Sequence, residues 1–217
     1  MYLPKEILSI VGDATYQIDN IGRSDDLVLV FEDKYILKIS NSEKRLLREK
    51  IKVDWLVDKI PGSKSLCYLE EDGKYYYLRT CIVGDSLISE RFLTNPGLLI
   101  DVLDKVMKVL KSLDDYICPF NSTDNTGEDF IHGDLCLPNI FVNDQNEFVG
   151  FIDLENSGNG DRWYDYAWLL WSVWYNLKTC KYHSLLLKKL GITYDNDLMK
   201  KYLPSEYYES MQIGEYL

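Results

Sequence analysis

Polar residues able to carry out phosphoryl transfer interrupt an otherwise apolar segment, FIHGDLCLPNIFV, at residues 130–142. Asp134 and Asn139 lie five positions apart in it, and Asp153 ends a second apolar stretch, EFVGFID. In phosphoryl transfer a carboxylate orients the attacking hydroxyl, and carboxylate or amide oxygens hold Mg²⁺ on the phosphates. The pattern therefore indicates Asp134 as the catalytic base, with Asn139 and Asp153 as ligands of Mg²⁺.

A lysine and a glutamate nearer the N-terminus could supply the phosphate-binding cation. Strand alternation places Ile36 and Lys38 on one face, so both are candidate nucleotide contacts. A lysine in so apolar a strand is costly to bury unless an anion meets it, and Glu49 on the following helix is the candidate partner. Nucleotide phosphotransferases use a lysine braced by a glutamate in this way.

Each of these residues also has an ordinary interpretation. Lys38 and Glu49 could be surface charges, and Asp134 and Asn139 could form Asx turns beside a hairpin, with their charges solvated. The order Lys, Glu, Asp-x4-Asn, Asp along the chain favours phosphoryl transfer over these separate explanations.

Strand signals dominate the first part of the chain. LVLVFEDKYILKI (27–39) is two β-rich runs about a turn at 32–34, and SLCYLEEDGKYYYLRTCI repeats the pattern about Asp72-Gly73, a favoured hairpin turn. Between the hairpins, EKRLLREKIKVDWLVDKI predicts a helix, with Leu47, Ile51 and Trp55 at helical spacing.

Helical signals follow Gly84. Asn95-Pro96 is a capping sequence, and the stripe behind it predicts one helical face: Leu99, Val102, Leu103, Val106, Leu110 and Leu113. A hairpin at IFVNDQNEFVGFID and three further helices complete the chain. We expect Trp168, Trp171 and Trp174 to pack in the core and His183 to lie on the surface.

The predicted fold class is α+β with two lobes. The N-terminal lobe, 1–82, would be a small antiparallel sheet with one helix, and 83–217 would be mainly helical, with a boundary near Thr80–Gly84.

Composition limits the partners and the compartment. The chain has 217 residues and a formal net charge of −11, which disfavours nucleic acid and would attract a cationic small molecule, although solubility alone also explains the charge. The longest apolar run, Ala167–Tyr175, is too short to span a bilayer, and MYLPKEILSIVGD does not resemble a secretory leader. Five cysteines without metal-type spacing indicate reduced thiols, so we expect a cytoplasmic protein.

Three motifs together resemble the aminoglycoside phosphotransferases, especially the 3′-type kanamycin kinases, which share the protein-kinase-like fold. H-G-D-x4-N is met at His132–Asn139, G-F-I-D at Gly150–Asp153, and D-x-x-x-D-x-A at Asp161–Ala167. REKIKVDWL is similar to the segment carrying the lysine-bracing glutamate, which selects Glu49 rather than Glu43.

The resemblance implies a purine nucleotide, ATP or GTP, with Mg²⁺, and a purine contact from the main chain of Cys81 and Ile82. No glycine-rich G-x-G-x-x-G loop precedes the strand that carries Lys38. The segment NIGRSDD occupies that position, and its Ser24 is a candidate phosphate contact. Glu206 and Glu209 are candidate contacts for the amines of the acceptor, with Glu215 near the end of the chain.

Three residues of the motifs are expected to support the site rather than react. The resemblance makes Asp165 a support of the catalytic loop through main-chain hydrogen bonds. Asp161 fits a helix N-cap, and His132 fits a hydrogen-bonded anchor of the loop better than a proton carrier.

One departure from the family pattern leaves the identity of the phosphate acceptor undetermined. Only eleven residues, 120–130, separate Pro119 from Ile131, where relatives have a longer helical stretch that walls the aminoglycoside pocket. Three hypotheses follow: a kinase of an aminoglycoside, a kinase of another small alcohol or amino sugar, or a nucleotide-binding protein of this fold without turnover.

Overall fold

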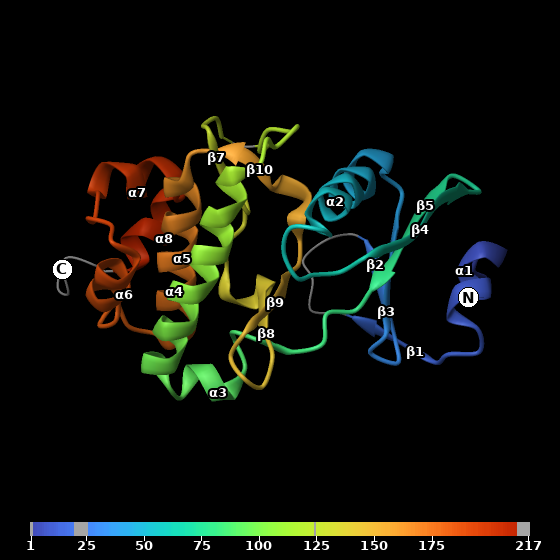
Figure 1. Ribbon diagram of the computed structural model, residues 1–217, viewed down its shortest axis with the longest axis horizontal. Coiled ribbons are helices and arrows are strands. Elements are labelled where there is room, and N and C mark those ends of the chain that lie inside the picture. Colours follow the sequence, from blue (N-terminus) through green and yellow to red (C-terminus); the bar gives the residue numbers. More distant parts are fainter. Residues whose placement is uncertain (1, 20–25, 124, 212–217) are drawn as a thin grey trace. The chain divides into compact units, whose positions relative to one another are not determined.

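Two hairpins that the sequence predicts from their turn residues form most of the N-terminal sheet. The computed structural model describes residues 2–19, 26–123 and 125–211 and divides the chain into two units, Met1–Val83 and Gly84–Leu217 (Figure 1). The strands of the first unit are β1 (Tyr16–Asp19), β2 (Leu27–Phe31), β3 (Tyr35–Ser40), β4 (Ser65–Glu71) and β5 (Lys74–Thr80). They form one antiparallel sheet in the order β1-β2-β3-β5-β4.

The turns at residues 32–33 and 72–73 explain why these strands pair as hairpins. Glu32 and Asp33 have φ values of 47° and 56°, and Asp72 and Gly73 have values of 52° and 73°. Two successive positive φ angles give the turn whose twist matches that of the flanking strands. Both predicted hairpins are confirmed.

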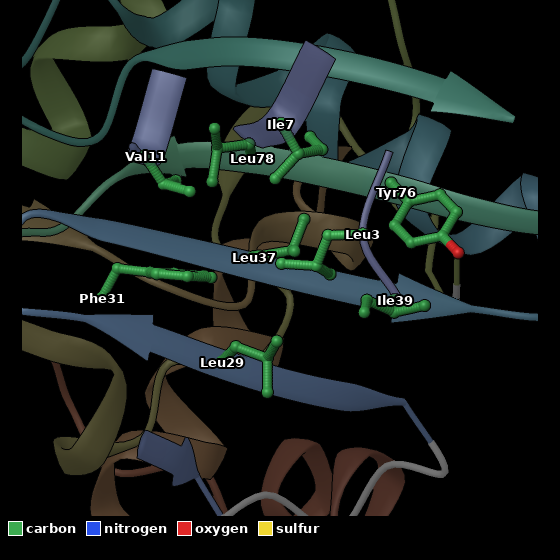
Figure 2. Packing of buried hydrophobic residues seen from close by; sticks show 9 residues of the cluster. All are labelled: Leu3, Ile7, Val11, Leu29, Phe31, Leu37, Ile39, Tyr76 and Leu78. Atoms are coloured by element: carbon green, nitrogen blue, oxygen red, sulfur yellow. The ribbon is translucent and has the colours of Figure 1, made fainter. Parts of the chain in front are cut away.

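A helix that the sequence analysis does not predict, α1 (Lys5–Val11), covers one face of this sheet. Figure 2 shows Leu3, Ile7 and Val11 from the N-terminal segment against side chains of the sheet; those partners are Leu29, Phe31, Leu37, Ile39, Tyr76 and Leu78. Gly12 ends the helix with a φ of 61°. The helix is only seven residues long, so its periodicity is too brief to detect.

The predicted helix between the hairpins, α2 (Glu43–Leu56), is present, but its buried side differs from the expected series. Leu47 and Ile51 are 37% and 40% exposed, whereas other members of the helix are buried: Leu46, Glu49, Lys52, Val53 and Leu56. Apolar residues occur on both sides of this helix, and packing selects the side that also carries Glu49.

The second unit combines helices with short strands. Its helices are α3 (Glu90–Leu93), α4 (Pro96–Ser112), α5 (Arg162–Leu177), α6 (His183–Leu190), α7 (Asn196–Tyr202) and α8 (Ser205–Ser210). Its strands are β6 (Asp85–Ser86), β7 (Asp129–Ile131), β8 (Ile140–Val142), β9 (Phe148–Phe151) and β10 (Gly158–Gly160). Sheets of order β6-β8-β9 and β10-β7 result. No helix within the described ranges is both long and apolar enough to cross a bilayer.

The helix α4 forms as predicted. The Asn95 side chain accepts a hydrogen bond from the Leu98 amide and Pro96 is the first helical residue. The six residues of the predicted apolar stripe are all buried.

The tryptophans of α5 are not in the core, so that expectation is wrong. Trp168, Trp171 and Trp174 are only partly buried, and the aliphatic residues Leu169, Leu170 and Val173 occupy the core side instead. The helix is apolar nearly all round, so spacing alone does not identify its core face. Aromatic packing holds the outer side: the Trp171 ring is stacked with Tyr175 and with Tyr207 of α8, at centroid distances of 5.0 and 4.8 Å.

His183 is fully buried, which contradicts the expected surface position. It is the first residue of α6, and neither ring nitrogen has a hydrogen-bond partner of good geometry. Burial lowers its pKa to about 4, and the backbone carbonyl of Leu170 acts in the opposite direction. The helix buries the apolar side formed by Leu186, Leu187 and Leu190, and this side carries His183 inward with it.

This burial predicts an acid-sensitive stability. Because the folded state keeps His183 neutral while the unfolded chain takes up a proton near pH 6.5, stability is full above that pH and falls as the pH drops towards 4. We expect His183→Phe to remove about 2 kcal/mol of the loss between pH 7 and pH 5, measured by chemical denaturation. His132 is the only other histidine and is unchanged, so it cancels in the comparison. Equal pH slopes for the two proteins would refute the prediction.

Candidate active site

The segment that carries Asp134 leaves β7 through a glycine that no other residue could replace without strain. Gly133 has a φ of 80°, and a Cβ there would lie 2.5 Å from the carbonyl oxygen of Asn156. The Cys136 amide then donates to the Asp134 carbonyl at 2.8 Å, and the 3₁₀ turn Leu137–Asn139 leads into β8. The glycine of the motif is therefore required for the turn that presents Asp134.

The Asp165 carboxylate holds this loop from α5. Its two oxygens accept hydrogen bonds from the amides of His132 and Gly133, at 2.6 and 2.9 Å. Asp165 is fully buried, and burial raises its pKa to about 7 against the opposing effect of the two amide donors. These are the main-chain hydrogen bonds that the resemblance implies for Asp165.

His132 anchors the loop from inside. Its Nδ1 accepts from the Asp134 amide at 3.2 Å, so Nε2–H is the donor to the Ile152 carbonyl at 3.0 Å. The ring is fully buried, and burial lowers its pKa while the carboxylates of Asp134 and Asp153 oppose the shift. A neutral, doubly hydrogen-bonded imidazole is a structural anchor.

Asn139 orients the carboxylate of Asp134. Its amide nitrogen donates to both the Oδ2 and the backbone carbonyl of Asp134, each at 2.9 Å. With the nitrogen so used, no hydrogen bond from a described residue reaches the Asn139 side-chain oxygen. That oxygen is therefore available as a ligand, while the half-buried Asp134 carboxylate is held at the surface of the loop.

The hairpin β8–β9 brings Asp153 to the same end as Asn139. Ile140 pairs with Phe151, and the Ile152 amide donates to the Asn139 carbonyl at 3.0 Å. Asn139, just before β8, and Asp153, just after β9, therefore lie at the same end of the hairpin. Asp153 is exposed and adopts the left-handed conformation, with φ 56° and ψ 49°. Such backbone is uncommon for residues other than glycine, although aspartate and asparagine adopt it more readily than most, and it occurs both in turns and at functional sites.

The donor set fits Mg²⁺ held with a nucleotide. Among the described residues, no group of three or more His, Cys, Asp or Glu side chains could hold a metal ion by itself. Mg²⁺ usually keeps several waters and takes one or two protein carboxylates or carbonyl oxygens together with substrate phosphates. One amide oxygen and one exposed carboxylate, from Asn139 and Asp153, match that requirement.

In the first unit, Lys38 and Glu49 form the expected ion pair. The Lys38 Nζ lies 2.8 Å from Glu49 Oε2, and the two side chains are 14% and 5% exposed. The pair joins β3 to α2. A second cation that the sequence pattern does not predict, Arg79 on β5, has its Nε 3.6 Å from Glu49 Oε1. Its only sequence signal was a charge in the strand KYYYLRT.

The remaining candidate nucleotide contacts of this unit differ in whether their side chains or amides are accessible. Ile36 is partly buried on the Lys38 face of β3. The Cys81 amide donates to the Lys34 carbonyl at 2.8 Å, so this N–H is already used and Ile82 supplies the next amide along the chain. Ser24 lies outside the described residues.

The other candidates belong to the second unit. Asp161 caps α5 by accepting from the Trp163 amide at 2.9 Å, and it also accepts from the Tyr202 hydroxyl. Its observed contacts are structural. Glu206 and Glu209 are exposed and one turn apart on α8, whereas Glu215 lies outside the described residues.

The Asp165 hydrogen bonds generate a prediction about stability. Asp165→Ala would leave the amides of His132 and Gly133 buried without an acceptor, so we expect unfolding to become easier by about 2–5 kcal/mol. Denaturant unfolding at constant slope would measure the change. Asp104→Ala, which removes a carboxylate from an exposed pair with Lys108, is the matched control. An Asp165→Ala protein as stable as this control would show that the loop does not depend on the carboxylate.

Comparisons with known proteins find similarity to phosphotransferases. Residues 128–197 match the phosphotransferase enzyme family, a range that includes the loop at residues 132–139, the β8–β9 hairpin and α5. The "Probable aminoglycoside 3′-phosphotransferase" of Lactococcus lactis subsp. lactis (strain IL1403) is 27% identical, over 87% of this chain and 87% of its own. The aminoglycoside 3′-phosphotransferase of Enterococcus faecalis is 28% identical, over 84% and 85%.

Solved structures share the fold at lower identity. The aminoglycoside phosphotransferase APH(3″)-Id of Streptomyces rimosus, in complex with ADP and streptomycin, matches with a TM-score of 0.72 and 18% identity, over 94% of this chain and 95% of that one. The GDP and kanamycin complex of a 2″-phosphotransferase matches with a TM-score of 0.61 and 15% identity, over 96% and 88%. The predicted α+β, kinase-like fold class is confirmed. Residues 128–197 thus match the phosphotransferase enzyme family, and over most of its length the chain is a distant homologue of the aminoglycoside 3′-phosphotransferases.

Proposed function

We propose that the protein transfers the terminal phosphate of ATP or GTP, as the Mg²⁺ complex, to a hydroxyl of an aminoglycoside. The observation that carries the proposal is the Asp134 carboxylate, held by the Asn139 amide on a loop that Asp165 fixes. A half-buried carboxylate in a fixed position can orient an alcohol and receive its proton.

The residues of each unit have separate tasks in this reaction. Asp134 aligns the acceptor hydroxyl and takes its proton as the oxygen bonds to phosphorus and the nucleoside diphosphate leaves. Asn139 and Asp153 would hold Mg²⁺, which when bound neutralises charge on the phosphates. Lys38, braced by Glu49, would bind the phosphates of the same nucleotide. Most of the rate acceleration then comes from positioning and from charge stabilisation.

Charge supports a cationic acceptor. The chain carries a net charge of −11, and Glu206 and Glu209 present carboxylates on α8. Curated relatives are described as aminoglycoside 3′-phosphotransferases, and solved relatives are complexes with streptomycin or kanamycin.

The short segment before β7 favours a more open acceptor site. The described part of 120–128 forms no helix; Gly127 instead packs against Gly160, and the Asn125 side chain accepts from the Asp161 amide at 2.6 Å. A kinase of another small alcohol or amino sugar is therefore the second candidate.

A panel of acceptors tests the proposal. Release of ADP or GDP should require Mg²⁺ and should increase when kanamycin or another aminoglycoside is added. Stimulation by other alcohols or amino sugars alone would support the second candidate. Nucleotide binding without acceptor-stimulated release would support a protein of this fold without turnover.

Asp134→Asn is expected to lower turnover by about 10²–10⁴-fold, the usual contribution of a positioned base. Nucleotide affinity should change by less than about twofold, because Asp134 is proposed to contact the acceptor hydroxyl and not the nucleotide. A twofold change corresponds to ~0.4 kcal/mol. Single-turnover phosphate transfer and titration calorimetry measure the two effects. Asp144→Asn, which changes a 95% exposed carboxylate in the turn of the β8–β9 hairpin, is the control. A near-normal rate for Asp134→Asn would remove the residue from this role.

Asp153→Asn is expected to weaken binding of the nucleotide only when Mg²⁺ is present. Asparagine tolerates the left-handed backbone at this position, so the variant tests the charge and not the fold. The affinity for the magnesium complex should fall by at least about tenfold, since even an outer-shell partner of a metal typically contributes that much. Calorimetry with and without EDTA separates the two forms. Equal affinity of variant and wild type in Mg²⁺ would exclude Asp153 as a ligand.

A further inference from the structure

A buried arginine shares the face of the sheet that carries Lys38. Arg79 is 3% exposed and lies one residue before the end of β5. It is paired with Ile36 across the β3–β5 ladder, as Lys38 is paired with Tyr77. Directly paired residues project to the same side of a sheet, so Arg79 and Lys38 both face α2.

The Glu49 carboxylate lies between these two cations and uses one oxygen for each. Oε2 is 2.8 Å from Lys38 Nζ, and Oε1 is 3.6 Å from Arg79 Nε. Both Glu49 and Arg79 have side chains that are less than a tenth exposed, so their attraction is little screened by solvent.

The far side of the guanidinium is fixed as well. Arg79 Nη1 donates to the Ser63 hydroxyl at 2.6 Å, and that hydroxyl donates to the Thr80 carbonyl at 2.9 Å. The Lys64 amide in turn donates to the Thr80 hydroxyl at 2.9 Å. A planar guanidinium held at both ends has little freedom to move, unlike a lysine at the same place.

We propose that Arg79 is a positioning residue that keeps Glu49 in place while Lys38 engages the phosphates of the nucleotide. The inference rests on the proposed function and extends it to a residue outside the lysine–glutamate pair. When a triphosphate binds, Lys38 must divide its hydrogen bonds between Glu49 and the phosphate oxygens. The second cation on Glu49 Oε1 then holds the carboxylate, and so holds Lys38 in the direction of the phosphates.

A double-mutant cycle tests this coupling. Arg79→Met removes the charge and keeps much of the side-chain volume. We expect it to weaken binding of the magnesium triphosphate by about tenfold, which corresponds to ~1.4 kcal/mol. In a Lys38→Met background, Arg79→Met should add less than about twofold, because sites that act through one another are not additive. Calorimetry gives the four dissociation constants.

Two single variants sharpen the result. Arg79→Lys keeps a cation opposite Glu49 but not the planar group fixed by Ser63, so it should recover only part of the affinity lost in Arg79→Met. Arg91→Met removes an arginine that bonds Asp85 and the Asn143 carbonyl in the second unit, and its nucleotide affinity should equal that of the wild type. If Arg79→Met does not fold, Ser63→Ala releases the guanidinium and should show a smaller loss with the same dependence on Lys38.

The outcomes separate this inference from the proposed function. An equal loss of nucleotide affinity from Arg79→Met in the wild type and in Lys38→Met would show that Arg79 does not act through Lys38. Unchanged affinity in Arg79→Met would show that Arg79 has no role in nucleotide binding. Either result overturns the inference while the wild type still binds nucleotide and transfers phosphate. A wild type that binds no purine nucleotide would overturn the proposed function and this inference with it.

Discussion

The attachment of the loop at residues 132–139 to a buried carboxylate is the constraint on which the candidate active site depends. Asp165 accepts from two successive backbone amides, and this arrangement fixes the peptide planes immediately before Asp134. Backbone amides inside a protein must find an acceptor, and here no strand or helix supplies one. A side chain from α5 therefore determines where the loop lies, and through it where the carboxylate of Asp134 points.

From this attachment the other contacts of the second unit follow in sequence. His132 turns inward and bonds the Ile152 carbonyl, which ties the loop to the end of the β8–β9 hairpin. Asn139 bonds back to Asp134, and the Ile152 amide bonds Asn139. Each contact satisfies a buried polar group, and together they place three oxygen-bearing side chains at one end of a short hairpin. A site built in this way contributes geometry more than reactive chemistry, which is what phosphoryl transfer requires of a protein.

The first unit solves a different electrostatic problem. Lys38 is kept in a largely apolar sheet by a buried glutamate, and a buried glutamate needs more than one polar partner. Arg79 provides the second partner and is itself restrained by Ser63. The sheet's other face carries an apolar cluster that packs against α1. The two faces of one strand thus carry core packing and ligand chemistry separately, because adjacent residues alternate across the sheet.

Local rules made much of the fold predictable. Turns with positive φ at Asp33 and Asp72, the Asn95-Pro96 cap and the alternation about Lys38 depend on residues close together in the sequence. The order of Lys38, Glu49, Asp134, Asn139 and Asp153 could be read as phosphoryl-transfer chemistry because that reaction demands those side-chain types. The same local rules identified the ion pair, since a lysine in an apolar strand needs a nearby anion.

By itself, then, the sequence determined the strands of three hairpins, most of the longer helices, the fold class and the residue types of the candidate site. Only the tertiary structure decided which face of α2 is buried, that His183 lies inside, that the tryptophans of α5 pack outside the core, and that Arg79 meets Glu49. The physical reason is the same in each case. Propensity and periodicity describe neighbours along the chain, whereas burial and ion pairing depend on residues that packing brings together from distant segments.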